Sequence, residues 1–126
     1  MTLRVLYVDD EEDIREVAAM SLELDPELRV ETCASGEQAL SAAAAAPPDV
    51  ILLDVMMPRM DGPATLARLQ ADSRTREVPV IFITARTQAA DVRRLLGLGA
   101  IGHIAKPFDP LALAGQVRSL LEDPPA

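Results

Sequence analysis

The sequence predicts an α/β fold, a three-layer sandwich of (βα)5 type in which parallel strands alternate with helices. Two observations carry this prediction: short apolar runs recur along the chain, and stretches with helical spacing lie between them. Runs that are apolar at successive positions are typical of a parallel sheet with helices on both faces. Right-handed crossovers leave few topologies open.

The expected strands are short apolar runs separated by turn-forming residues. They lie at residues 5–8, 30–33, 50–53, 80–83 and 101–105. The intervening stretches carry apolar residues three and four positions apart, as a helix with one buried face requires. The clearest of these sets are Ile14, Val17, Ala18 and Leu22; Val92, Leu95 and Leu96; and Leu113, Val117, Leu120 and Leu121.

Capping residues predict where several helices begin and end. Ser35, with Gln38 three residues later, forms a possible capping box at a helix start. Asp109 followed by Pro110 predicts an N-cap with proline at the first helical position. Gly99 suits the end of the fourth helix.

The length and the net charge of the chain limit the classes of function that it can have. The 126 residues suit one domain, and a net charge of -8 disfavours direct binding to nucleic acid or an anionic membrane, because Lys and Arg bind phosphate groups. No apolar stretch has the length of a membrane span, and we find no signal peptide. The single cysteine, Cys33, is expected to be a small buried residue in a reducing compartment. We therefore expect a cytoplasmic protein.

Polar residues follow four of the expected strands. Strand one ends in Asp9 and Asp10, strand three in Asp54, strand four in Thr84 and strand five in Lys106. In open α/β sheets, ligands bind beyond the carboxyl ends of the strands. If these strands are neighbours, three carboxylates, a hydroxyl and an ammonium group converge on one edge of the sheet.

Such a cluster suits phosphoryl chemistry assisted by a metal ion. Closely packed carboxylates raise one another's proton affinity, so a cation is expected among them. Donors that are all oxygen suit a hard ion such as Mg²⁺ rather than zinc. A carboxylate can attack phosphorus, and the transfer then needs positioning and charge neutralisation. Asp54 is the candidate nucleophile, Lys106 the neutralising group and Thr84 a hydrogen-bond donor.

Taken singly, each of these residues also has an ordinary structural explanation. An Asp after a strand is often a turn former or a helix cap, which is the better explanation for Asp9 or Asp10 alone. Thr84 is a β-branched residue suited to a strand end, and Lys106 before a proline is a common kind of surface lysine. The combination points to a site more strongly than any one member does.

The motifs at these strand ends resemble the receiver domain of two-component response regulators, and the resemblance covers nearly the whole chain. They read VDDEED at the first strand end, LLDVMMPRMDG at the third, ITA at the fourth and AKPF at the fifth. The resemblance implies a flavodoxin-like sheet with strand order 2-1-3-4-5. It also implies a cis peptide bond between Lys106 and Pro107.

The resemblance further implies a role for each site residue. Asp54 would accept a phosphoryl group from a histidine kinase or a histidine phosphotransfer protein, and Thr84 and Lys106 would contact that group. The ligands of Mg²⁺ would be Asp10, Asp54, the backbone carbonyl of Met56 and, through water, Asp9. Such a domain is a stoichiometric phosphoacceptor that acts as a switch, not an enzyme.

Three positions bear on how the switch behaves. In the family an aromatic residue on the fifth strand moves together with the threonine, and His103 stands at that position here. His103 is either a half-buried packing residue or a lever that makes the switch pH-sensitive, because histidine titrates near neutrality. Met56 and Arg86 stand at positions flanking the site that, in the family, influence how quickly water reaches the acyl phosphate. They predict a long-lived phosphoryl group, although both also suit ordinary loop positions.

We expect a receiver domain at residues 1–122 and a tail or linker stub at 123–126. The chain is either a stand-alone receiver or part of a longer regulator, and both readings remain open. In the family the fourth helix, fifth strand and fifth helix form the output surface, which would bind a downstream protein or a second copy of the chain. Its charges here are mixed: Asp91, Arg93, Arg94, His103 and Arg118.

Three other functions fit the residues less well. A phosphatase of the haloacid dehalogenase type would carry a second acid two residues beyond its nucleophile, where Met56 stands. A flavin-binding domain would need a phosphate-cradling loop after the first strand, where the sequence is acidic, and aromatic residues, which are 2% of the chain. A receiver that binds partners without phosphorylation would not need the complete set of acids, threonine and lysine.

Overall fold

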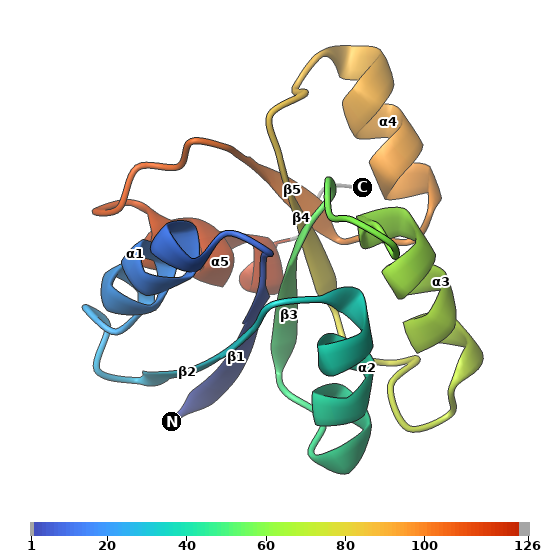
Figure 1. Ribbon diagram of the computed structural model, residues 1–126. Helices are drawn as coiled ribbons and strands as arrows, with labels where there is room; N and C mark the ends of the chain where they lie inside the picture. Colours follow the sequence, from blue (N-terminus) through green and yellow to red (C-terminus); the bar gives the residue numbers. More distant parts are fainter. Residues whose placement is uncertain (1, 124–126) are drawn as a thin grey trace.

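The computed structural model describes residues 2–123, which form a five-stranded parallel sheet with helices on both faces (Figure 1). The strands are β1 (Leu3–Val8), β2 (Leu28–Cys33), β3 (Val50–Asp54), β4 (Val80–Thr84) and β5 (Gly102–Ala105). The helices are α1 (Glu12–Leu22), α2 (Gly36–Ala45), α3 (Gly62–Ala71), α4 (Ala89–Gly97) and α5 (Leu113–Glu122). The strand order β2-β1-β3-β4-β5 confirms the predicted fold. Most of the expected tail, residues 124–126, lies outside the described residues.

Two hydrophobic layers cover the sheet. α1 and α5 pack on one face, where Leu22 and Val117 are completely buried. α2, α3 and α4 pack on the other face through residues such as Ala39, Leu69 and Leu95. Figure 1 shows the two groups of helices on opposite sides of the strands. None of the helices in residues 2–123 has the length and apolar character needed to cross a membrane.

The central strands match the sequence expectation better than the edge strand does. β3 and β4 are buried at every position, as their continuous apolar runs predict. The expectation of apolar strands throughout is wrong for β2, where Glu31 and Thr32 are exposed because this strand lies at the edge of the sheet. Cys33, at the end of β2, is buried as predicted.

The predicted start of the second helix and the predicted end of the fourth helix are confirmed. The backbone N–H of Gln38 donates to Ser35 Oγ at 3.1 Å, so Ser35 is the N-cap of α2. The Gln38 side chain accepts in turn from the backbone of Ala34 at 2.8 Å. Gly99 follows α4 with a φ of 111°, a left-handed conformation that glycine adopts without strain, and its N–H donates to Leu96.

The predicted start of the last helix is wrong. α5 begins at Leu113, not directly after Asp109. The Asp109 side chain accepts the N–H of Leu111 at 2.9 Å, and its carbonyl accepts the N–H of Ala112. Asp109 therefore stabilises a turn ahead of the helix, which is the other common use of an Asp side chain next to its own backbone.

Candidate functional site

An acidic cluster lies where the carboxyl ends of the strands meet. Asp9 follows β1 and Asp54 ends β3, its neighbour in the sheet. Carboxylate oxygens of Asp9, Asp10 and Asp54 all lie within 4.8 Å of one another. Asp9 and Asp54 are buried, with 0% and 3% of their surface exposed, whereas Asp10 is exposed. The structure thus brings together the three acids that the sequence predicted.

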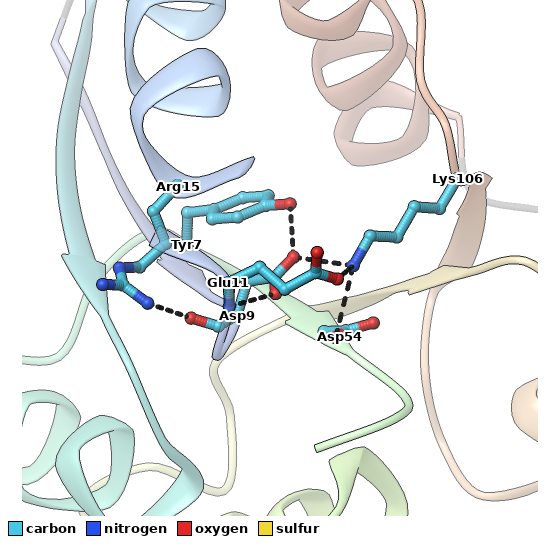
Figure 2. A network of polar contacts seen from close by, with 6 residues as sticks. All are labelled: Tyr7, Asp9, Glu11, Arg15, Asp54 and Lys106. Carbon is cyan, nitrogen blue, oxygen red and sulfur yellow. Dashed lines mark hydrogen bonds and ion pairs between the residues drawn. The ribbon is translucent and has the colours of Figure 1, made fainter. Parts of the chain in front are cut away.

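Lys106 follows the edge strand β5, and its side chain reaches into this cluster (Figure 2). Its Nζ donates to Asp9 Oδ2 at 3.0 Å, to Glu11 Oε1 at 3.3 Å and to Asp54 Oδ2 at 3.5 Å. Lys106 is the only lysine of the chain, since the other basic residues are arginines. The peptide bond between Lys106 and Pro107 is cis, as the resemblance implied.

Asp54 faces a pocket of about 500 Å³. Met56, Thr84 and Lys106 line the pocket beside it, and apolar side chains such as Ile14 of α1 complete its wall. Met56 is largely exposed, whereas Thr84 is buried at the end of β4. A charged ligand bound to Asp54 would therefore meet the ammonium group of Lys106 in a pocket with an apolar rim.

The loop after Asp54 requires a glycine. The N–H of Gly62 donates to the carbonyl of Val55 at 2.9 Å, which folds the loop back beside β3. A Cβ on Gly62 would lie 2.6 Å from the backbone oxygen of Asp54 and 2.9 Å from Val55 Cα, too close for any other residue. Asp61 then caps α3 by accepting the N–H of Ala64 at 2.9 Å. The Asp-Gly pair of the third motif thus holds the backbone of Asp54 in place.

The charges in the cluster are only partly compensated. Burial, together with the charge of the neighbouring Asp9, raises the pKa of Asp54 from 3.8 to about 6 against the opposing effect of Lys106. Partial burial lowers the pKa of Lys106, but its bonds with the acids outweigh this and raise it above the ordinary value. Lys106 is therefore a permanent cation, and the excess negative charge is what a bound metal ion would neutralise.

Asp9 is held by protein donors at both carboxylate oxygens (Figure 2). Its Oδ1 accepts the backbone N–H of Glu11 at 3.0 Å, and its Oδ2 accepts from the Tyr7 hydroxyl at 3.2 Å and from Lys106. Arg15 donates to the backbone carbonyl of the same residue at 2.8 Å. Sequence reasoning missed Tyr7, Glu11 and Arg15. For Tyr7 there was a signal: it lies two residues before Asp9, on the same side of β1.

Thr84 is engaged outside the acidic cluster. Its Oγ accepts the N–H of Arg86 at 3.0 Å and donates to the carbonyl of the same residue at 3.3 Å. The Arg86 side chain is exposed and lies outside the pocket.

His103 lies apart from the site. It is half-buried on β5, opposite Phe82, in a separate groove against Gly115 and Gln116 of α5. The structure therefore gathers the predicted acids, Met56, Thr84 and Lys106 at one place and leaves His103 and the Arg86 side chain outside it.

The donor set fits a hard divalent cation. The cluster offers carboxylate oxygens from the ends of two neighbouring strands, and one of its members, Asp54, has an elevated pKa because it is buried and lies beside Asp9. Crowded oxygen donors of this kind are typical of Mg²⁺ sites. The residues present could hold such an ion.

The family model of the response regulator receiver domain matches residues 5–118. The chain belongs to this family. Among curated relatives, the response regulator PleD of Caulobacter vibrioides is 42% identical over 121 residues, which are 95% of this chain and 26% of that protein. The probable transcriptional regulator ycf27 of Guillardia theta is 38% identical over 118 residues, 94% of this chain and 45% of that protein. The chain thus spans less than half the length of these two relatives.

Solved receiver structures show the same fold. The chemotaxis response regulator CheY4 of Vibrio cholerae has a TM-score of 0.87 at 32% sequence identity, and the match covers 95% of this chain and 99% of that one. A response regulator from Chloroflexus aurantiacus, described as putative, has a TM-score of 0.87 at 29% identity, covering 97% and 99% of the two chains. These similarities support the receiver fold along nearly the full length of this chain.

Proposed function

We propose that the chain is a phosphorylation-activated switch that accepts a phosphoryl group on Asp54 and then changes its partner-binding surface. The position of Asp54 carries this proposal. It is a buried carboxylate at the end of a central strand, 3.5 Å from Lys106 and clustered with two other acids. It also faces a pocket, so that a donor can reach it.

In the proposed reaction, a carboxylate oxygen of Asp54 attacks the phosphorus of a phosphohistidine on a histidine kinase or a histidine phosphotransfer protein. The P–O bond forms as the P–N bond breaks, and the imidazole leaves with the electron pair of that bond. Because the pKa of Asp54 is about 6, its carboxylate is mostly ionised at neutral pH. Lys106 offsets the negative charge of the transferring oxygens. Each chain accepts one group, so it acts stoichiometrically rather than as an enzyme.

Mg²⁺ is the cofactor of this proposal. Its ligands would be Asp10, Asp54 and the backbone carbonyl of Met56, with Asp9 acting through water. Bound there, the ion would supply positive charge to the phosphoryl oxygens. An indirect role for Asp9 agrees with its existing bonds to Tyr7 and Lys106, which already occupy its Oδ2.

The phosphoacceptor role is tested by labelling with acetyl phosphate or phosphoramidate in the presence of Mg²⁺. We expect the wild-type chain to gain one phosphoryl group and Asp54→Asn to gain none. Asp61→Asn is the matched control, because it changes a second Asp of the same loop and keeps an oxygen that can cap α3. Labelling that persists in Asp54→Asn, or is lost equally in Asp61→Asn, contradicts the assignment.

Thr84 and His103 are the proposed switch residues. The Thr84 hydroxyl would leave Arg86 to contact the phosphoryl group, and His103 would respond on the neighbouring strand. Thr84 and Ala105 are paired in the sheet, and Ala105 lies two positions from His103. A movement at the end of β4 would therefore act on β5. We expect chemical-shift changes linked to phosphorylation to vary between pH 6 and pH 8, where an ordinary histidine titrates. A flat profile would leave His103 as a packing residue.

Met56 and Arg86 are proposed to slow hydrolysis of the acyl phosphate. The exposed Met56 lines the pocket beside Asp54, and the Arg86 backbone contacts Thr84. The apolar side chain of Met56 offers no polar group that could orient an attacking water molecule. We expect the double variant Met56→Asn/Arg86→Glu to lose its phosphoryl group faster than the wild type. An unchanged half-life would refute this role.

The proposed receiver unit spans residues 1–122, and its output surface lies on α4, β5 and α5. That surface would bind a downstream protein or a second copy of the chain rather than nucleic acid directly. One of its expected charges, Arg118, donates to Asp25 and Glu27 of the loop between α1 and β2. The exposed Arg93 and Arg94 on α4 are therefore the better candidates for partner contacts.

A further inference from the structure

Tyr7 is the only tyrosine of the chain, and its side chain is completely buried beneath the acidic cluster. Its ring meets the ring of Phe108 edge to face, with centroids 6.4 Å apart and planes at 72°. Figure 2 shows the hydroxyl directed at Asp9, away from the backbone of β1. The ring is thus fixed by packing, and the hydroxyl has one defined direction.

The hydroxyl is a permanent donor to Asp9. It lies 3.2 Å from Asp9 Oδ2, and both groups are buried. Burial, followed by the charge of Asp9 and the hydrogen bond to it, raises the pKa of Tyr7 far above the ordinary value for a phenol. Hydrogen bonds to charged acceptors are the stronger kind.

The other donor at the same oxygen is less well fixed. Lys106 reaches Asp9 Oδ2 at 3.0 Å, but its Nζ also contacts Glu11 and Asp54. A lysine side chain is flexible, and its ammonium group is free to turn among several acceptors. The Glu11 backbone N–H holds only Oδ1. The rigid donor that sets the direction of Oδ2 is therefore Tyr7.

We propose that Tyr7 is a positioning residue of the metal site: its hydroxyl orients the Asp9 carboxylate toward the cluster with Asp10 and Asp54. This inference rests on the proposed Mg²⁺ site. Groups that orient metal-binding residues by hydrogen bonds contribute about 10- to 100-fold to metal affinity. Because Asp9 acts indirectly in the proposed site, the lower end of that range is expected.

The position of Tyr7 also makes it an optical reporter. The chain has no Trp, so its ultraviolet fluorescence comes from Tyr7, with a minor part from two Phe residues. A carboxylate that accepts a hydrogen bond from a phenol quenches the emission of that phenol. A cation entering the cluster draws charge from Asp9 and weakens this quenching. The tyrosine emission of the wild type should rise with Mg²⁺ and saturate.

The test compares the wild type with Tyr7→Phe and Tyr7→Leu. Mg²⁺ affinity is measured by calorimetry at constant ionic strength, and thermal unfolding is measured without metal. Tyr7→Phe removes the hydroxyl and keeps the ring against Phe108, whereas Tyr7→Leu removes both. We expect about tenfold weaker Mg²⁺ binding in both variants. The unfolding temperature should fall much further in Tyr7→Leu, which separates positioning from packing.

Each other outcome decides against the inference. If Tyr7→Phe binds Mg²⁺ as tightly as the wild type, the hydroxyl does not position the site, while the proposed metal site stands. If affinity falls only in Tyr7→Leu, ring packing is responsible. If the wild type binds no Mg²⁺ and its fluorescence stays constant, the proposed metal site fails and the inference fails with it. Labelling of Asp54 remains a separate test of the phosphoacceptor role.

Discussion

Replacing Asp54 by asparagine should stabilise the folded protein at neutral pH in the absence of metal ions. The substitution removes a buried negative charge from a cluster of acids and preserves the size of the side chain. Lys106 keeps partners after the change, because its Nζ also contacts Asp9 at 3.0 Å and Glu11 at 3.3 Å. The variant therefore relieves repulsion without leaving a buried cation unpaired.

The magnitude follows from the pKa of Asp54. It lies at about 6 rather than at the ordinary 3.8, a difference that corresponds to about 3 kcal/mol of unfolding free energy at about 1.4 kcal/mol for each pH unit. Between these two pH values the folded state binds more protons than the unfolded state, so stability falls as the pH rises. The ionised carboxylate thus destabilises the fold fully above pH 6, and the effect disappears below pH 3.8.

Urea unfolding in EDTA, followed by circular dichroism, measures this difference. We expect Asp54→Asn to be more stable than the wild type by about 2 to 3 kcal/mol at pH 7.5. Near pH 4 the two proteins should be almost equally stable. Glu16→Gln is the control, because it removes one negative charge from an exposed position on α1. An Asp54→Asn variant that is no more stable than the wild type at pH 7.5, or whose advantage does not change with pH, refutes the reasoning.

Three further substitutions or reactions test the structure around the site. Ser35→Ala removes the N-cap of α2 and should lower the unfolding free energy by about 1 kcal/mol, measured by urea unfolding. Gly62→Ala places a Cβ against the backbone oxygen of Asp54. It should lower the unfolding free energy by about 1–3 kcal/mol. It should also slow phosphorylation of Asp54, and mass spectrometry measures that rate. Burial raises the pKa of the Cys33 thiol to about 11. Cys33 should therefore resist thiol reagents at pH 8 in the folded protein and react at once in urea; equal rates in both conditions would contradict its burial.

Much of the site could be predicted because parallel strands have their carboxyl ends at one edge. Once the apolar runs are assigned as strands, the residues that follow them must share that edge, whatever the details of packing. Asp54, Thr84 and Lys106 follow directly from this rule. The strand order and the roles of single residues came from the family resemblance, because apolar runs alone do not say which strands are neighbours.

The contacts that sequence reasoning missed, and the helix start that it placed wrongly, depend on side-chain geometry that no sequence pattern specifies. Tyr7 looks like one more apolar strand residue until its hydroxyl is seen to reach Asp9. Glu11 looks like an exposed acid at a helix start, yet it contacts Lys106 from a position 95 residues away. At Asp109 the sequence allowed a helix cap or a turn, and the same carboxylate serves either, so local signals could not separate them.

The turn at Thr84 has a consequence for the proposed switch. The threonine hydroxyl gives and accepts a hydrogen bond with the same residue, Arg86. Any spontaneous excursion of this hydroxyl toward Asp54 must break both bonds, at about 1 kcal/mol each. In the proposed switch, a phosphoryl group on Asp54 would therefore have to offer the hydroxyl an acceptor stronger than these two bonds together, which sets a threshold for the change.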